Sequence, residues 1–252
     1  MLSNPYFWAA AIPAVVMVGL SKGGLGPLGS MAVPILSLAI SPVQAAGLTL
    51  PIFVMSDVVA VISYRRRFDL PTLKIMLPAA LAGVGVGWLT AAWVNEDAVR
   101  LIVGATSALF ALNYWFRGGR TAEPARPNAM KGRAWGAAAG FTSFVSHSGG
   151  PPFQMYALPL RLAPQVFAGT SVLFFATINA TKLVPYFFLG QFDRANLAAA
   201  AALAPLSILC ALGAVQLVKV IDQALFYRIV YVLMFALGLF LIGQAGIDLI
   251  RS

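Results

Sequence analysis

The residues best suited to chemistry gather around two glycine-rich stretches. The first reads SKGGLGP, from Ser21 to Pro27, and the second reads SHSGGPP, from Ser146 to Pro152. Glycine ends helices and lets the backbone approach a ligand, whereas proline suits the first turn of a new helix. Each stretch therefore predicts a helix stop followed by a helix start.

A helix start exposes unpaired N–H groups and a partial positive charge, which together can bind an anion. We expect a substrate site where the new helices begin, after Gly26 and Gly150. The alternative is that the glycines serve only close helix packing. The candidate substrate-binding residues at the two breaks are Ser21, Lys22, Gly23, Gly24, Gly26, His147, Ser148, Gly149 and Gly150.

Three further polar residues, Ser171, Asn179 and Lys182, share one face of a predicted helix, eight and eleven positions apart. Facing lipid they would be costly, so we expect them to face the protein interior. Asp57 lies within another apolar run and is the candidate for coupling to a proton. Its alternative role is that of a structural partner for a lysine. The alternative for Lys22 is that it extends to a membrane interface.

His147 is the only histidine, and Ser146 and Ser148 flank it. A serine–histidine pair would suit a hydrolase, but adjacent residues on a helix point in different directions. One histidine, no suitable cysteine and scattered carboxylates argue against a metal site, and we expect no cofactor. The preferred role of His147 is a substrate hydrogen-bond donor or a proton-sensitive gate.

The elements that must hold these residues are membrane helices. The 252-residue chain is 60% hydrophobic and 10% charged, whereas soluble domains have about 25% charged residues. Spans of about 20 apolar residues cross a bilayer, and they must be helical to satisfy their own backbone. We expect an all-α polytopic membrane protein with long spans at Ala45–Tyr64, Leu73–Val94, Leu101–Phe116, Ala195–Val218 and Ile229–Ile250.

The net charge of +9 comes mainly from two loops, Arg65–Asp69 and Arg117–Arg133. Basic loops of this kind mark the cytoplasmic side of a membrane protein. An anionic partner is the alternative explanation, but nucleic-acid binding lacks a soluble basic domain to carry it. The first twenty residues lack a basic start and a cleavage site, so we expect them to belong to the mature protein.

The chain also contains a weak internal repeat. Gly24–Gly47 aligns with Ser148–Gly169, and further along Asp57 aligns with Asn179. This divides the chain into a first repeat (1–116), a basic cytoplasmic linker (117–133) and a second repeat (134–252). The short segments Pro27–Ile40 and Pro151–Leu162 would reach only about 20 Å and are expected to be half-spanning or re-entrant. An odd number of crossings per half would invert the two repeats, as in many secondary transporters.

A family resemblance rests on two stretches of the chain, GLSKGGLGPLGSMAVPIL and HSGGPPFQMYALPLRLAPQVFAGTSVLFFATINATKLVPY. Together with the two-halved layout, they resemble the sulfite exporter TauE/SafE family over nearly the whole chain. The resemblance implies a transporter, usually bacterial and therefore in the plasma (inner) membrane. It also implies a small sulfur-containing or organic anion as substrate, such as sulfite or sulfoacetate.

We therefore predict a secondary transporter, in the export direction, of sulfite, an organosulfonate or a similar small anion, working by alternating access. The alternatives are an anion channel and an intramembrane hydrolase. The expected partners are the small anion, the lipid bilayer and a coupling proton, and the sequence does not define the oligomeric state. If Lys22 binds the anion, Lys22→Ala should weaken anion binding more than folding.

Overall fold

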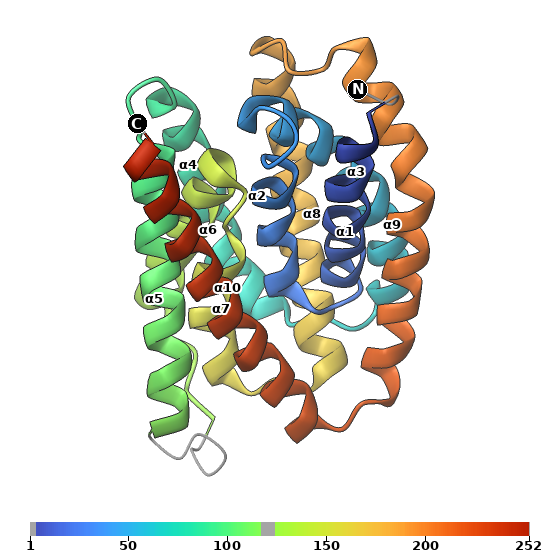
Figure 1. Cartoon of the computed structure of the whole chain (residues 1–252). Coiled ribbons are helices and arrows are strands. Elements are labelled where there is room, and N and C mark those ends of the chain that lie inside the picture. Colours follow the sequence, from blue (N-terminus) through green and yellow to red (C-terminus); the bar gives the residue numbers. More distant parts are fainter. Residues whose placement is uncertain (1–3, 117–123, 252) are drawn as a thin grey trace.

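The computed structural model describes residues 4–116 and 124–251, which form helices and connecting loops without a strand (Figure 1). The helices are α1 (Pro5–Lys22), the 3-10 helix η1 (Gly26–Met31), α2 (Ala32–Leu36), α3 (Pro42–Tyr64), α4 (Leu70–Thr90), α5 (Glu96–Phe116), α6 (Ala129–Ser146), α7 (Gly150–Ala157), the 3-10 helix η2 (Leu158–Leu160), α8 (Pro164–Phe188), α9 (Arg194–Val220) and α10 (Gln223–Arg251).

Seven helices among the described residues are long and apolar enough to cross a membrane, namely α1, α3, α4, α5, α8, α9 and α10. This confirms the predicted all-α class, and the chain is an integral membrane protein. The five long spans expected from the sequence correspond to α3, α4, α5, α9 and α10. Each of these helices begins before the first residue of its predicted span.

Polar caps explain why the helices begin earlier than hydropathy alone indicates. At the start of α3, for example, the side chain of Ser41 accepts a hydrogen bond from the backbone N–H of Gln44, and Pro42 occupies the first turn. Such caps satisfy N–H groups that have no partner within the helix. Side-chain caps of this kind precede α1, α3, α4, α6 and α9, at Asn4, Ser41, Asp69, Asn128 and Asp193.

The expected linker, 117–133, is partly helical. Its residues 117–123 lie outside the described part of the chain. Residues 124–128 form a loop, and α6 begins at Ala129 because Asn128 caps the backbone N–H of Lys131. The last five residues of the predicted linker therefore belong to α6.

Each half contains a helix, a break and a short returning segment. The first half turns after Lys22 and returns as η1 and α2 beside α1. The second half turns after Ser146 and returns as α7 and η2 beside α6. The returning segments span Gly26–Leu36 and Gly150–Leu160, close to the predicted Pro27–Ile40 and Pro151–Leu162. The helix stop and start predicted at each glycine-rich stretch are confirmed.

The turns themselves depend on left-handed backbone. Gly24 has φ +122°, a value that residues other than glycine rarely adopt. His147 has φ +53° and caps the end of α6 in the left-handed region, where histidine is more frequent than most residues. The break in the second half is thus made by the chain's only histidine.

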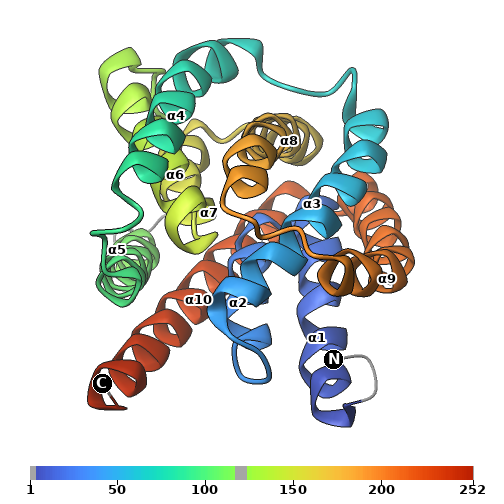
Figure 2. The same cartoon turned by 90° about the horizontal axis from the view of Figure 1, so that it is seen from above.

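The long helices pair across the two halves of the chain. α1 packs against α9, α4 against α6, α5 against α10, and α3 against both α8 and α9. Glycine permits the closest of these approaches, because a Cβ atom at Gly136 or Gly140 of α6 would collide with the backbone of α4. α3 and α8 have the largest buried share of the seven spans and lie near the middle of the bundle in the view from above (Figure 2).

Candidate functional site

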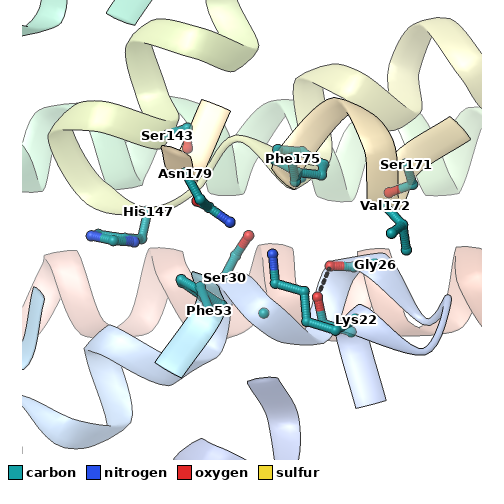
Figure 3. A pocket seen from close by; sticks show the side chains of 13 residues that line it. Lys22, Gly26, Ser30, Phe53, Ser143, His147, Ser171, Val172, Phe175 and Asn179 are labelled. Carbon is teal, nitrogen blue, oxygen red and sulfur yellow. Dashed lines mark hydrogen bonds between the residues drawn. The ribbon is translucent and has the colours of Figure 1, made fainter. Parts of the chain in front are cut away.

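A small cavity lies where the two breaks meet between α3 and α8. Its volume is about 40 Å³, which gives room for roughly three water molecules. Nearly all of the side chains around it are buried. Its lining residues are Ser21, Lys22, Gly26, Gly29, Ser30, Phe53, Ser143, His147, Gly150, Ser171, Val172, Phe175 and Asn179 (Figure 3).

The cavity brings together residues that the sequence places far apart. Seven of the predicted substrate-binding residues line it, namely Ser21, Lys22, Gly26, His147, Gly150, Ser171 and Asn179. They come from α1, η1, α6, α7 and α8, so both halves of the chain contribute. The predicted convergence of the two breaks on one buried space is thus present in the fold.

Lys22 brings a charged group to the lining of the cavity. The ammonium of Lys22 lies 2.7 Å from Asp57 Oδ1, and Asn179 Nδ2 donates a 2.7 Å hydrogen bond to Asp57 Oδ2. Lys22 is only 5% exposed, so it does not extend to a membrane interface. Asp57 is a lysine partner in this arrangement, and a coupling role for it stays a prediction. A buried pair of this kind keeps its charges only while both members are present.

Lys182 lies behind the cavity wall rather than in it. Its side chain is fully buried, and its ammonium donates to the Ser143 carbonyl oxygen at 2.6 Å. It also lies 3.3 Å from His147 Nδ1. Within the described part of the chain no carboxylate lies at ion-pair distance from it. Lys182 therefore faces two residues that line the cavity and has no carboxylate partner at ion-pair distance among the described residues.

His147 connects the cavity to Tyr186. Its Nε2 atom lies 2.8 Å from the Tyr186 hydroxyl, and its ring stacks on Phe53 with 5.7 Å between centroids. When Lys182 is protonated, its ammonium can only donate, so Nδ1 is then the acceptor and Nε2 carries the proton. Nδ1 therefore faces Lys182 and Nε2 faces Tyr186. Neither ring nitrogen contacts a serine among the described residues, as a hydrolase would need.

Backbone and hydroxyl groups also line the cavity. Ser21 Oγ donates to the Gly26 carbonyl at 3.3 Å. Gly150 is the first residue of the eight-residue helix α7, and Pro151 occupies its first turn. The first break instead begins the six-residue 3-10 helix η1, followed by the five-residue α2. The two predicted helix N-termini are therefore unequal, and only α7 presents an α-helical one.

Five predicted residues do not line the cavity: Gly23, Gly24, Ser148, Gly149 and Lys182. Except for Lys182, they shape the breaks. The Gly23 carbonyl accepts a 2.7 Å hydrogen bond from the Tyr64 hydroxyl, and Gly24 provides the turn. Ser148 donates to the Ser146 carbonyl, and Gly149 packs against Ala139 and Ser143 of α6.

Sequence reasoning missed six of the lining residues. Ser30 and Ser143 are small polar residues next to the breaks, and this position was the available signal. Phe53, Val172 and Phe175 resemble the apolar residues around them, and Gly29 resembles a packing glycine. The missed residues are Gly29, Ser30, Phe53, Ser143, Val172 and Phe175.

A second cavity, of about 180 Å³, lies between the starts of α3 and α5 and the end of α8. Glu96, Phe144 and Tyr186 are among the residues that line it. His147 lines the central cavity and Tyr186 lines the second one, so their hydrogen bond joins the walls of the two spaces. The ring of Phe144 packs edge-on against Tyr186 beside this contact.

Comparison with protein families gave one match over most of the chain. The family described as sulfite exporter TauE/SafE matches residues 11–241. Comparison with curated proteins and with solved structures found no match. The matched range includes both breaks, α3 and α8, and every residue that lines the central cavity.

Proposed function

The chain belongs to the sulfite exporter TauE/SafE family, and from this we propose a secondary transporter that exports a small sulfur-containing or organic anion, such as sulfite or an organosulfonate. Membership supports a membrane anion exporter rather than an enzyme. The observation that carries the proposal is the buried cavity at which the breaks of both halves meet. Transporter sites commonly lie at such breaks near the middle of the membrane.

The chemistry around the cavity suits an anion. The amine of Lys182, which has no carboxylate at ion-pair distance among the described residues, is held against the cavity wall by Ser143 and His147. Hydroxyl groups of Ser30 and Ser171 line the cavity, and the N-terminus of α7 opens onto it. Charge-assisted hydrogen bonds and helix N-termini both favour oxyanions. A bound anion would supply the negative charge that the described residues do not provide for Lys182.

The packing of the helices supports two related halves. Suppose that α1 to α5 of the first half correspond in order to α6 to α10 of the second half. The contact between α1 and α9 then corresponds to a contact between α6 and α4, and both contacts are present. α3 corresponds to α8 and α5 to α10, and the two members of each pair are in contact. Contacts of this kind are expected where a two-fold axis passes between the halves. Asp57 and Asn179, aligned in the sequence repeat, are hydrogen-bonded to each other. α1 and α6 start toward opposite ends of the molecule (Figure 1), which supports inversion.

Charge supports an orientation in the membrane. Arg65–Arg67, Lys131 and Arg133 lie near the end of the molecule where α3 and α5 end and α6 begins. At the other end, Glu96 and Asp97 form ion pairs with Arg100. The basic end would face the cytoplasm. The second cavity lies at the other end, so the His147–Tyr186 contact would close the route from the site to the outside.

The first experiment measures thermal unfolding of the purified protein in detergent with sulfite, sulfate, taurine, sulfoacetate and acetate. A ligand that binds only the folded state raises the melting temperature. We expect stabilisation by sulfite or a sulfonate, and saturable release of the same anion from liposomes that contain the protein. A protein that unfolds cooperatively, yet responds to none of these anions, would contradict the proposal.

The same liposomes distinguish a transporter from an anion channel. A channel passes ions far faster than a transporter turns over, and it gives electrical currents in a planar bilayer. The cavity is small and enclosed by buried side chains, which favours the transporter. We expect saturable flux without channel-sized currents.

A further inference from the structure

Gln154 is a buried amide that the site described above does not use. It lies on α7 and is 1% exposed. Neither its Nε2 nor its Oε1 atom has a hydrogen-bond partner among the described residues. A buried amide without partners lowers stability, and such groups are rare in folded proteins. Its presence on the returning helix therefore requires an explanation.

The amide of Gln154 lies next to two glycines that line the central cavity, although Gln154 itself is not part of the lining. A Cβ atom added at Gly26 would be 2.9 Å from Gln154 Nε2 and 3.6 Å from Ser171 Oγ. A Cβ atom added at Gly150 would be 4.0 Å from the same Nε2. Gly26, Gly150 and Ser171 all line the cavity, and helical side chains lean toward the helix N-terminus. Gln154 thus points from its own turn toward the N-terminus of α7.

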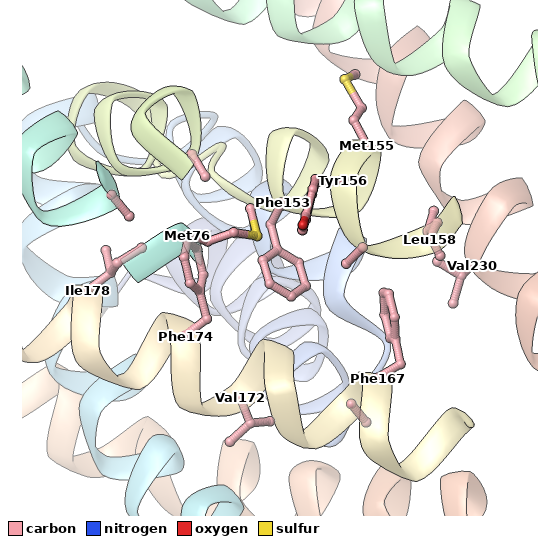
Figure 4. Packing of buried hydrophobic residues seen from close by; sticks show 14 of the residues in the cluster. Met76, Phe153, Met155, Tyr156, Leu158, Phe167, Val172, Phe174, Ile178 and Val230 are labelled. Carbon is pink, nitrogen blue, oxygen red and sulfur yellow. The ribbon is translucent and has the colours of Figure 1, made fainter. Parts of the chain in front are cut away.

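The neighbouring residue fixes this orientation. Phe153 is fully buried and packs against Phe167 and Phe174 of α8, with ring centroids 6.1 and 4.9 Å away (Figure 4). Its ring centroid also lies 5.6 Å from that of Phe175. Rotation of α7 would break these contacts. The amide is therefore held beside the cavity before any ligand arrives, which lowers the cost of ordering a binding residue.

We propose that Gln154 binds the transported anion directly, and that this anion is a singly charged oxyanion with a hydrogen-bond donor, such as hydrogensulfite. The inference rests on the proposed function. The amide offers a donor at Nε2 and an acceptor at Oε1. A fully deprotonated oxyanion would satisfy only the donor, whereas a protonated one satisfies both.

The charges around the cavity agree with a single negative charge on the ligand. Lys22 and Asp57 form an ion pair and neutralise each other. For Lys182, beside the cavity, the described residues supply no carboxylate at ion-pair distance, so its positive charge is the one that a bound anion would stabilise. One bound negative charge balances it, and a second would be buried without a partner, which is costly.

The test replaces the amide by an apolar side chain of similar length, Gln154→Met. Removing an unpartnered buried amide should leave the melting temperature of the ligand-free protein unchanged or raise it. The affinity for hydrogensulfite should fall roughly 10- to 100-fold, as expected for losing hydrogen bonds to a charged ligand. Gln154→Leu provides a second apolar variant with different packing and should show the same loss.

The matched control is Gln244→Met on α10. Gln244 Nε2 donates to the Pro34 carbonyl at 3.2 Å, and the residue does not line the central cavity. This variant should lower the melting temperature of the ligand-free protein and leave the affinity for hydrogensulfite unchanged. A general effect of removing a glutamine from the bundle would affect both variants alike.

Three probes separate the outcomes. The first is sulfite at mildly acidic pH, where it is mostly hydrogensulfite. The second is methanesulfonate, which has one charge and no hydrogen-bond donor, and the third is sulfate, which has two charges. We expect the unmodified protein to bind them in that order, and Gln154→Met to remove the difference between the first two. Equal affinity of the unmodified and Gln154→Met proteins for hydrogensulfite would overturn the role of Gln154, and preference for sulfate would overturn the single charge. Either result, with anion binding intact, leaves the proposed function standing. Binding of none of the tested anions overturns the proposed function and the inference together.

Discussion

The two buried lysines, Lys22 and Lys182, have opposite surroundings. Lys22 lies at the first break, 2.7 Å from the carboxylate of Asp57, and its ammonium is 4.6 Å from the centre of the Phe53 ring. Lys182 lies on α8 and contacts a carbonyl and an imidazole. One lysine therefore has its countercharge within the protein, whereas the other has none among the described residues. From this comparison we propose a mainly structural role for Lys22, and for Lys182 an electrostatic role toward the ligand from behind the cavity wall formed by Ser143 and His147.

The largest effect on stability should come from Lys22→Met, because it leaves the Asp57 carboxylate buried without its cation. Breaking one side of a buried ion pair costs about 3–5 kcal/mol. Thermal or denaturant unfolding in detergent measures this loss. From the sequence alone, Lys22→Ala is expected to affect binding more than folding. The ion pair with Asp57 instead predicts a large effect of this substitution on folding.

The matched control for this prediction is the double variant Lys22→Met with Asp57→Asn. It removes both charges together, so it should recover most of the stability that Lys22→Met loses, as in a double-mutant cycle. A Lys22→Met protein as stable as the unmodified one would show that the pair contributes nothing to folding. The contrast between the two lysines would then disappear.

Lys182→Met should weaken anion binding more than it lowers stability, which is the reverse of the result expected for Lys22→Met. It removes a buried cation that has no carboxylate partner, but it leaves the Ser143 carbonyl without a donor, so the loss of stability should be about 1–3 kcal/mol or less. The affinity for sulfite should fall roughly 10- to 100-fold. Binding titrations by thermal shift check this, and unchanged affinity would remove Lys182 from the site.

Tyr186→Phe tests the contact that extends from Lys182 through His147. Losing the hydroxyl should cost about 1 kcal/mol of stability. Tyr227→Phe is the control, because the Tyr227 hydroxyl donates to the Leu162 carbonyl at 2.9 Å away from the cavity. Both variants should lose similar stability, but only Tyr186→Phe should change the rate of anion release from liposomes. Equal rates would argue against a closing role for the His147–Tyr186 contact.

The smallest effect on stability should come from Gly150→Ala. The added Cβ would lie 3.2 Å from Ser30 Oγ, which requires a small adjustment, so stability should change by about 1 kcal/mol or less. The methyl group would occupy part of the cavity and should weaken sulfite binding several-fold. Gly213→Ala on α9 is the control, because a Cβ there meets nothing within 4 Å. Equal sulfite affinity in the two variants would contradict a site at the start of α7.

Local signals made much of the fold predictable from the sequence. Hydropathy located the long spans, and the glycine–proline stretches located both breaks within a few residues. Ser171 and Asn179 were found because helical spacing places them on one face. Gln154 could not be found in this way, because its lack of partners depends on how α7 packs against α8 and η1. The Lys22–Asp57 pair likewise joins two helices whose contact no local pattern specifies.

The hydrogen bond between Asp57 and Asn179 has a consequence for the resting state if the protein works by the proposed alternating access. The two residues are aligned in the proposed repeat but differ in charge. Two halves with identical side chains would make the inward-open and outward-open forms equal in energy, and unlike side chains remove that equality. We therefore expect one form to dominate without substrate. Exchanging the residues, as Asp57→Asn with Asn179→Asp, should shift the ratio of the two forms, which distance measurements between spin labels at the two ends can follow.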